Sequence, residues 1–244
     1  MKYKVLSKSY TNLVENVREY FLEADTNIWD RRNKIKILLF QKEEITIKSF
    51  KIPHIINKIA YTFFRDSKAK KSYENSLKII DFVPKPIGYA EFFQFGLLHE
   101  SYFLCEKFNY DFTIREVLVN NHYEDKNTIF QAFAAFTYKL HEKGIEHLDY
   151  SPGNILIRKL DNSYEFKIID VNRMRFKKFT IEERLENFAK LWAKDDDLRS
   201  IVNAYVAFID IDKDRAIDIA LKASQKHKDK KNLKKKLKGK EIVD

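Results

Sequence analysis

The chain has 244 residues, of which 44% are hydrophobic, which excludes a wholly disordered protein and permits two lobes that each have their own core. Its formal net charge is +10, but residues 226–240 hold nine lysines and one aspartate, a local +8 that leaves +2 elsewhere. This pattern describes a basic tail on an almost neutral chain, and without a helix-turn-helix, zinc-ligand or RNA-binding strand motif no specific nucleic-acid partner is expected.

The first part of the chain predicts a small lobe rich in strands. Leu13, Val17 and Phe21 recur at helical spacing, which indicates a leading segment that packs on this lobe. Strands are expected at residues 34–40, 44–50, 83–89 and 102–108, with a helix at residues 53–77. We expect the lobe to end near Asn109.

The second part predicts a helical lobe. Asn127 and Thr128 can cap a helix whose apolar residues recur every three or four positions, and Gly144 lies just past its end. Thr180 and Glu183 form a capping-box pattern before another amphipathic helix. Further helices are expected at residues 197–209 and 212–223. The predicted domains are therefore residues 1–108, residues 109–225 and a basic tail at residues 226–244.

The most informative motif is the run His147–Asn154, which is followed by apolar residues and then by Asp170. A loop with Asp149 and Asn154 leads into a hairpin, turning at residues 161–163, whose second strand brings Asp170 to the same place. Phosphoryl transfer from a nucleotide needs one carboxylate to orient the acceptor hydroxyl and oxygen ligands to hold magnesium. The motif therefore predicts a phosphotransferase that uses a nucleotide and Mg²⁺. The alternative is that these are ordinary polar loop residues, which their order and context disfavour.

Two departures from the protein-kinase pattern narrow the choice of acceptor. Residues 171–173 replace the Phe-Gly that usually follows the metal-binding aspartate, and no Ala-Pro-Glu precedes the helix that begins near Thr180. A segment that docks a peptide therefore has almost no room. Arg173 and Arg175 are candidates for binding an acidic acceptor, and a salt bridge to the lobe surface is an equal alternative for both. His147 is assigned a structural role that braces the loop.

A kinase also needs a strand lysine for the nucleotide phosphates and a helix carboxylate that positions this lysine. Lys48 lies in an alternating strand and is the candidate lysine. Glu74 is its candidate partner, although the spacing does not exclude Glu91, Glu100 or Glu106. Residues Glu106–Phe108 fall where a kinase connects its lobes, so their backbone is expected to meet adenine.

The usual glycine-rich loop over the phosphates is missing. The chain has five glycines, and none of them builds a Gly-x-Gly-x-x-Gly pattern before Lys48. The candidate turn at residues 41–44 contains no residue that adopts unusual dihedral angles freely. How the nucleotide phosphates are covered is therefore left open.

Taken together, these motifs resemble those of the bacterial lipopolysaccharide kinases, which phosphorylate the Kdo or heptose sugars of the inner core. The resemblance covers about residues 30–195 and rests on residues 47–53, 67–74, 83–89 and 147–154. It implies an α+β, bilobal, protein-kinase-like fold with a small β-rich N-lobe and a helical C-lobe, ATP with Mg²⁺, and a sugar hydroxyl as the acceptor. Carried over by position, it makes Lys48 the phosphate lysine, Glu74 its partner, Asp149 the base, and Asn154 and Asp170 the metal ligands.

Three other functions share much of this pattern and stay open. They are another small-molecule phosphotransferase of the antibiotic type, an atypical protein kinase, and a pseudokinase that binds a nucleotide without turnover. The complete set of Asp149, Asn154 and Asp170 disfavours a pseudokinase, because a protein without turnover has no reason to keep all three. Which sugar and which hydroxyl are modified is not decided by the motifs.

The expected location is the cytoplasm. Residues 1–7 lack the apolar core of a signal peptide, and no stretch approaches the ~18 apolar residues that span a bilayer. Cys105 is the sole cysteine and lies in an apolar run, which predicts a buried thiol in a reducing compartment. The tail at Lys226–Lys240 is either a solvated end or a contact to anionic lipid at the inner face of the cytoplasmic membrane, beside a glycolipid acceptor.

Overall fold

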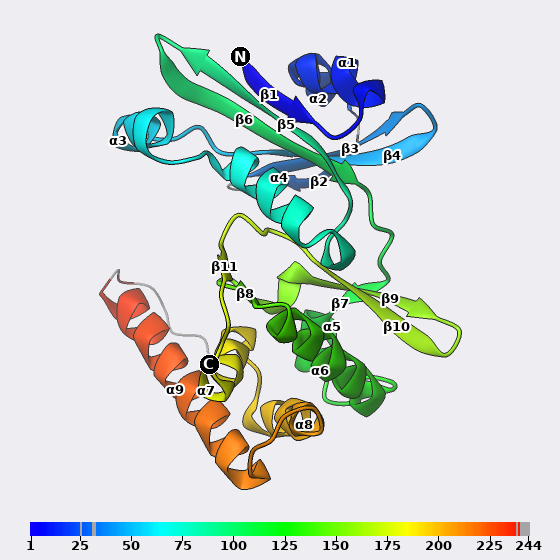
Figure 1. Ribbon diagram of the computed structural model, residues 1–244, viewed down its shortest axis with the longest axis vertical. Helices are drawn as coiled ribbons and strands as arrows, with labels where there is room; N and C mark the ends of the chain where they lie inside the picture. Colours follow the sequence, from blue (N-terminus) through cyan, green and yellow to red (C-terminus); the bar gives the residue numbers. More distant parts are fainter. Residues whose placement is uncertain (25, 31–32, 238, 240–244) are drawn as a thin grey trace. The chain divides into compact units, whose positions relative to one another are not determined.

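The computed structural model describes residues 1–24, 26–30, 33–237 and 239, and these separate into two compact units. Unit 1 comprises Met1–Asn109 together with Ile169–Asn172, and unit 2 comprises Tyr110–Ile168 and Arg173–Asp244. Figure 1 colours the chain along its sequence and labels the helices and strands. The mixture of helices and strands confirms the predicted α+β class.

Unit 1 is built on an antiparallel sheet with the strand order β1-β5-β6-β4-β3-β2. The strands are β1 (Lys2–Val5), β2 (Thr26–Asp30), β3 (Lys34–Phe40), β4 (Glu43–Ser49), β5 (Pro86–Gln94) and β6 (Leu97–Glu106). The predicted hairpin of β3 and β4 is confirmed. The predicted strand at residues 83–89 is longer than expected, because β5 runs on to Gln94 and joins β6 through a tight turn at Phe95 and Gly96.

Apolar side chains cover both faces of this sheet. On one face, α1 (Thr11–Glu15) and α2 (Val17–Glu23) contribute Leu13, Val17 and Phe21 to a core that the strands complete, as their spacing predicted. On the other face, Tyr73 of α4 (Lys68–Lys78) packs on Tyr89 of β5, with ring centroids 5.5 Å apart. The neighbouring β5 residues Tyr89 and Ala90 belong to opposite cores, as expected where side chains alternate along a strand.

The single helix expected at residues 53–77 is interrupted, which corrects the prediction. The chain forms α3 (Ile55–Ile59), continues as the π-helical turn η2 (Ala60–Phe64), and leaves helical geometry at Arg65. Ser67 then caps α4, because its hydroxyl accepts a hydrogen bond from the Lys70 amide at 3.1 Å. A serine that satisfies an amide of the first turn favours a new helix start over a continuous helix.

Unit 2 is mainly helical, with short strands. Its helices are α5 (Ile114–Val119), α6 (Lys126–Glu142), α7 (Ile181–Asn187), α8 (Asp195–Val206) and α9 (Lys213–Lys236). Its strands are β7 (Phe112–Thr113), β8 (Ile145–His147), β9 (Ile155–Leu160), β10 (Ser163–Ile168) and β11 (Met174–Phe176). The expected hairpin is present, since β9 pairs with β10 through a turn at residues 161–162.

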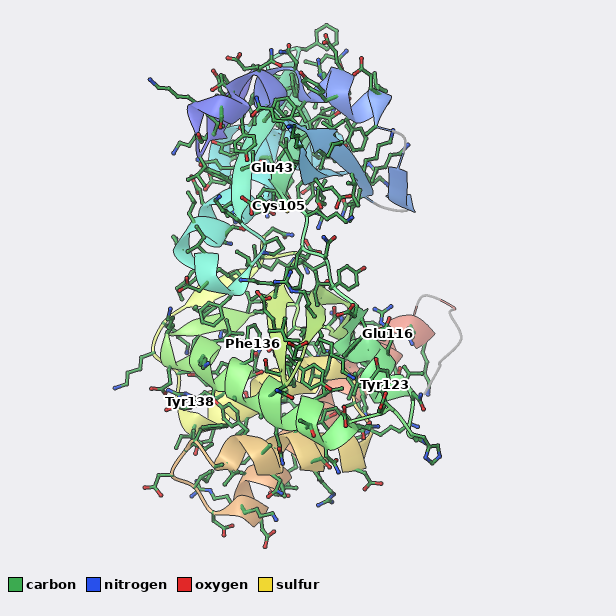
Figure 2. All side chains as sticks on the ribbon, turned by 90° about the vertical axis from the view of Figure 1, so that its right-hand side faces the viewer. Glu43, Cys105, Glu116, Tyr123, Phe136 and Tyr138 are labelled. Carbon is green, nitrogen blue, oxygen red and sulfur yellow. The ribbon has the colours of Figure 1, made fainter. Side chains whose placement is uncertain are left out.

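Aromatic side chains from several elements form the core of unit 2. Phe133 of α6 is fully buried and lies 5.8 Å from the ring of Tyr150 and 6.4 Å from that of Phe188. In Figure 2, Phe136 and Tyr138 mark α6, while Glu43 and Cys105 mark β4 and β6 of unit 1. This core holds α6 against the loop that follows β8.

Helix ends in unit 2 match the expectations in part. The Thr180–Glu183 capping box is confirmed, with both of its hydrogen bonds present, and Gly144 follows α6 as predicted. The start of α6 was predicted two residues too late, because the helix begins at Lys126. The ammonium of Lys126 lies 2.8 Å from a carboxylate oxygen of Asp197 in α8. This partly buried ion pair favours a helix that begins at Lys126, before the cap predicted at Asn127 and Thr128.

The last helix is longer than residues 212–223, so much of the lysine-rich segment is helical. Lys228 donates to the Ala193 carbonyl at 3.0 Å, His227 packs on Trp192, and the ammonium of Lys235 lies 5.7 Å from the Trp192 ring centroid. These contacts stabilise α9 despite its like charges. Of the predicted tail, residues 238 and 240–244 lie outside the described residues. Among the described helices, none has the length and the apolar character needed to cross a membrane.

Candidate active site

The predicted phosphate lysine and the predicted metal-binding aspartate meet in unit 1. Lys48 lies on β4, between β3 and β6, where pairing on both sides fixes its backbone. Its ammonium nitrogen is 2.7 Å from Oδ1 of Asp170, and both side chains are partly buried. Two residues that lie 122 positions apart in the chain therefore form one ion pair.

Asp170 is held by its own backbone and by α4. Its φ is 60°, a left-handed conformation that aspartate adopts more readily than most residues. The next residue, Val171, accepts a hydrogen bond at its carbonyl from the Asn75 side chain at 2.6 Å. The side chain of Asn172 donates to Oδ1 of Asp170 at 2.5 Å. These contacts fix the direction in which the carboxylate points.

Glu74 is close to a different lysine. Its carboxylate lies 3.9 Å from the ammonium of Lys70 on the same helix, and Lys70 is 2.6 Å from Asp66. The hydrogen bond that Lys70 donates to the Asp66 carboxylate raises the pKa of Lys70. Because Lys48 contacts Asp170, the pairing of Lys48 with Glu74 stays a prediction.

The predicted adenine-binding residues end the last strand of unit 1. The carboxylate of Glu106 lies 2.8 Å from the ammonium of Lys85, and the Glu106 amide donates to the Lys85 carbonyl at 2.9 Å. Phe108 is half-buried. Their proposed contact with adenine uses the backbone and stays a prediction.

The turn between β3 and β4 corrects an expectation about dihedral angles. Gln41 and Lys42 adopt φ of 51° and 71°, although neither is a glycine. Phe40 pairs with Glu43, so these residues form a two-residue turn with the backbone twist that hairpins prefer. The seven paired residues of each strand stabilise a conformation that local preference disfavours.

The predicted catalytic loop lies in unit 2 and is organised by its own polar groups. Nδ1 of His147 accepts a hydrogen bond from the Asp149 amide at 3.0 Å, and the His147 ring is 1% exposed. The Asp149 carbonyl accepts from the Asn154 side chain at 2.9 Å and from the Ser151 amide at 2.7 Å. The amide and the carbonyl of Asp149 are thus both held by hydrogen bonds. The bond to the amide is the contact expected if His147 braces the loop.

Two oxygen-bearing groups of this loop remain accessible. Within the described ranges, no hydrogen bond or ion pair engages the carboxylate of Asp149, which is half-buried. Asn154 uses its side-chain nitrogen in the loop, which leaves Oδ1 without a partner among the described residues. A carboxylate and an amide oxygen are therefore presented by a rigid loop.

Helix α6 supports this loop through Tyr150. The Tyr150 hydroxyl lies 2.8 Å from the hydroxyl of Thr137, and both side chains are buried. Burial raises the pKa of Tyr150, so its hydroxyl stays protonated. The phenol and its hydrogen bond hold the residue directly after Asp149 in one place.

The two arginines after Asp170 differ in their surroundings. Arg175 on β11 lies opposite Glu146 on β8, with the nitrogen and oxygen 3.2 Å apart, and Lys190 is 2.9 Å from the same carboxylate. This is the salt bridge that the sequence left as the alternative. The carbonyl of Arg173 accepts from the Leu148 amide at 3.0 Å, and its side chain is exposed. Contact of either arginine with an acceptor stays a prediction.

The lipopolysaccharide kinase (Kdo/WaaP) family model matches residues 76–202, which is more than half of the chain. The chain belongs to this family. The match includes Asp149, Asn154 and Asp170, and membership in a kinase family supports a phosphotransferase.

Two solved structures are similar to this chain. The structure described as WaaP in complex with acyl carrier protein is similar with a TM-score of 0.62 and 11% identity, over 94% of this chain and 99% of that chain. The MAP kinase LmaMPK10 from Leishmania major is similar with a TM-score of 0.48 and 17% identity, over 84% of this chain and 64% of that chain. Among curated proteins, comparison by sequence gives no match. The likeness to WaaP confirms the predicted kinase-like fold.

The structure adds positioning residues that the motifs did not indicate. Asn75 holds the segment after Asp170, and Tyr150 fixes the loop that carries Asp149. Asn75 directly follows Glu74 on α4, but no sequence motif indicated a partner for it. Its hydrogen bond reaches a residue 96 positions away, which no local pattern reveals.

Proposed function

We propose that this family member transfers the γ-phosphoryl group of ATP to a sugar hydroxyl of the lipopolysaccharide inner core, with Kdo or heptose as the sugar. The observation that carries the proposal is the family match over residues 76–202, which contains the whole set Asp149, Asn154 and Asp170. The geometry within each unit supports it. Unit 1 supplies a cation and a carboxylate in contact, and unit 2 supplies an accessible carboxylate and an amide oxygen.

Asp149 is proposed to orient the acceptor hydroxyl and to take its proton. A carboxylate in this role must be free of other partners and held in position. The accessible Asp149 carboxylate on a braced backbone fits both conditions. His147 acts through that backbone and does not touch the reacting atoms.

Asp170 and Asn154 are proposed to hold Mg²⁺ on the nucleotide phosphates. The donor set fits a hard cation, because both residues offer oxygen atoms, and the Asp170 carboxylate already accepts the positive charge of Lys48. Bound magnesium would offset the charge that develops on the transferred phosphoryl group. Lys48 would then leave its contact with Asp170 and bind the phosphates. Glu74 on α4 is the residue proposed to position Lys48 for this contact.

The proposal is tested by Asp149→Asn, which keeps the shape of the side chain and removes its basicity. We expect turnover to fall by about a thousandfold or more, because proton removal and orientation of the hydroxyl are both lost. Nucleotide binding should be nearly unchanged. The matched control is Asp161→Asn, which makes the same change at the exposed turn of the β9–β10 hairpin and should leave turnover as it is.

The acceptor is identified with labelled ATP and a panel of acceptors. A Kdo-lipid and a heptose-containing core should accept phosphate, whereas an aminoglycoside, choline and a protein should not. Transfer to the aminoglycoside or to choline would support an antibiotic-type phosphotransferase, and transfer to the protein would support an atypical protein kinase. Nucleotide binding without transfer to any acceptor would support a pseudokinase. Full turnover by Asp149→Asn would remove the mechanism.

We also propose that the protein works at the inner face of the cytoplasmic membrane, where a glycolipid acceptor lies. The lysines of Lys226–Lys240 would supply attraction to anionic lipid, at about 1 kcal/mol for each lysine near the surface. Lys228 and Lys235 contact other residues of unit 2, so the other lysines of this segment would carry this role. The WaaP structure contains acyl carrier protein, and a protein partner for this chain is a further proposal.

A further inference from the structure

The apolar segment, residues 52–64 of unit 1, exposes side chains that neither face of the sheet uses. Neither α3 nor η2 contains a buried residue. Ile56 and Phe64 are 78% and 80% exposed. The other exposed apolar residues of the segment are Ile52, Ile55, Ile59 and Phe63. A single exposed apolar residue is ordinary, but a run of this kind on one short helical stretch indicates an interaction surface.

Polar contacts tie this segment to the sheet. The Thr62 hydroxyl accepts a hydrogen bond from the Leu98 amide of β6 at 2.9 Å and donates to the Lys58 carbonyl at 2.7 Å. The ammonium of Lys58 lies 3.3 Å from Nδ1 of His99. Figure 1 shows α3 beside the hairpin of β5 and β6. The segment is therefore anchored by polar groups, while its apolar side chains face away from the core.

Positive charge surrounds the apolar segment. Residues 51–71 contain six lysines and arginines and one aspartate, a net charge of +5. A pocket of about 480 Å³ adjoins Phe63 and Phe64. Its charged lining residues are Lys2, Arg65, Lys70 and Lys71 on the basic side and Asp66 and Glu91 on the acidic side. Apolar side chains thus lie directly beside a mainly cationic hollow.

We propose that the apolar segment and this basic pocket dock unit 1 on a bilayer that contains anionic phospholipid. Ile55, Ile56, Phe63 and Phe64 would enter the boundary between headgroups and acyl chains, and the pocket would face the headgroup phosphates. Interfacial helices combine these two features. A second copy of the chain fits less well, because pairing this surface with itself would bring like charges together. The proposal concerns a surface of unit 1 and does not depend on the kinase reaction or on the lysine-rich helix of unit 2.

A fluorescent probe at single positions tests the insertion. Burial raises the pKa of the Cys105 thiol to about 12, so this cysteine should not react with a thiol-directed dye at neutral pH. Ile56→Cys and Leu22→Cys introduce the label at positions with 78% and 79% exposure, on α3 and on α2. With vesicles of phosphatidylcholine and phosphatidylglycerol, emission at position 56 should shift to the blue, and emission at position 22 should stay unchanged. Vesicles of phosphatidylcholine alone should give a weaker shift.

Sedimentation with the same vesicles measures the affinity of the full chain. The double variant Ile56→Glu, Phe64→Glu should lose about tenfold or more in vesicle binding, whereas Leu22→Glu should bind as the unchanged protein does. Circular dichroism checks that each variant is folded, and the labelled cysteine variants decide the question if the glutamates prevent folding.

Three results would overturn the proposal. The first is the absence of vesicle binding. The second is binding without any shift at position 56, which would assign attachment to the lysines of α9. The third is a shift at position 56 that depends on protein concentration or on an added protein and occurs without vesicles, which would make the segment a protein interface.

Discussion

Asp170 combines a left-handed backbone with a charged contact. Its φ of 60° is rare outside glycine, and its carboxylate meets Lys48 at 2.7 Å. Backbone conformations of this kind persist where surrounding contacts determine them, and they cluster at functional sites. The hydrogen bond from Asn75 to the next residue supplies one such contact. At the scale of single residues, the site is therefore held by side chains that the motif does not contain.

His141 is a buried residue of unit 2 whose environment excludes charge. Its Nδ1 lies 2.8 Å from the Tyr205 hydroxyl, and its Nε2 lies 3.4 Å from Oδ1 of Asn187. A neutral ring can accept from the first group and donate to the second. Burial lowers the pKa of His141 to about 4, with the nearby Arg184 and Lys190 acting in the same direction.

This lowered pKa predicts acid sensitivity below neutral pH. Above pH ~6.5 the ring is neutral in both the folded and the unfolded chain, so it adds no pH dependence. Between pH ~6.5 and about 4, His141 binds a proton in the unfolded chain but stays neutral in the folded chain. The free energy of unfolding therefore falls as the pH falls. Urea unfolding at pH 7.5 and pH 5 should reveal a loss of about 1 to 2 kcal/mol from this group.

The control for this prediction is His141→Asn, which keeps hydrogen-bonding atoms and removes the titration. This variant should be less stable than the unchanged protein at pH 7.5 but should lose less of its remaining stability on moving to pH 5. An equal loss in both proteins would show that His141 does not control the acid response.

At the scale of elements, β5 is the strand on which both cores of unit 1 depend. It pairs with β1 and β6, and its residues reach α1 on one face and α4 on the other. Gly88 lies on β5 where β1 and α1 both come close to the strand. A Cβ at this position would lie 2.6 Å from the Lys4 carbonyl oxygen and 2.9 Å from a methyl carbon of Val14.

Gly88→Ala should therefore destabilise unit 1 by about 1–3 kcal/mol, because the added methyl group would push β1 and α1 away from β5. Urea unfolding followed by circular dichroism measures this change. Val14→Ala removes the Cγ2 methyl group that makes one of the two close contacts. In the double variant, the two changes should destabilise less than their sum, since each relieves part of the crowding at the other. Strict additivity would mean that Val14 does not crowd this position.

At the scale of the whole molecule, each compact unit carries some of the residues that the proposed function requires. Lys48 and Asp170 belong to unit 1, while Asp149 and Asn154 belong to unit 2. The family match begins at residue 76 and so covers three of these four residues. A ligand that binds the folded chain and not the unfolded chain raises its stability by mass action.

MgATP should therefore raise the melting temperature, with a stabilisation of about 2.7 kcal/mol when the ligand is at 100 times its Kd. Thermal unfolding with MgATP, with ATP and EDTA, and without ligand measures the effect. Removal of magnesium should reduce the shift, because the negative charges of the phosphates and of the Asp170 carboxylate would no longer be offset by the cation. Lys48→Met should abolish most of the shift. Lys51→Met is the matched control on an exposed lysine and should keep it.

The sequence by itself determined the α+β class, most element positions and the family. These features depend on local rules, namely the period of two in β3 and β4, the helical spacing of Leu13, Val17 and Phe21, and the Thr180–Glu183 capping box. The run from His147 to Asn154 and the strand before Asp170 were equally visible in the sequence, and the catalytic and metal-binding roles of their polar residues stay predictions.

Only the tertiary structure decided which partner each polar group takes and where elements end. Lys48 meets Asp170, Asn75 meets the Val171 carbonyl, and Arg175 meets Glu146, over separations that local patterns do not encode. Gln41 and Lys42 adopt left-handed backbone because the paired strands beside them require it. Helix α9 extends beyond residue 223 because it packs on other residues of unit 2, such as Ala193 and Trp192. In the β3–β4 turn and in α9, contacts outside the segment itself contribute more free energy than the local preference that they override.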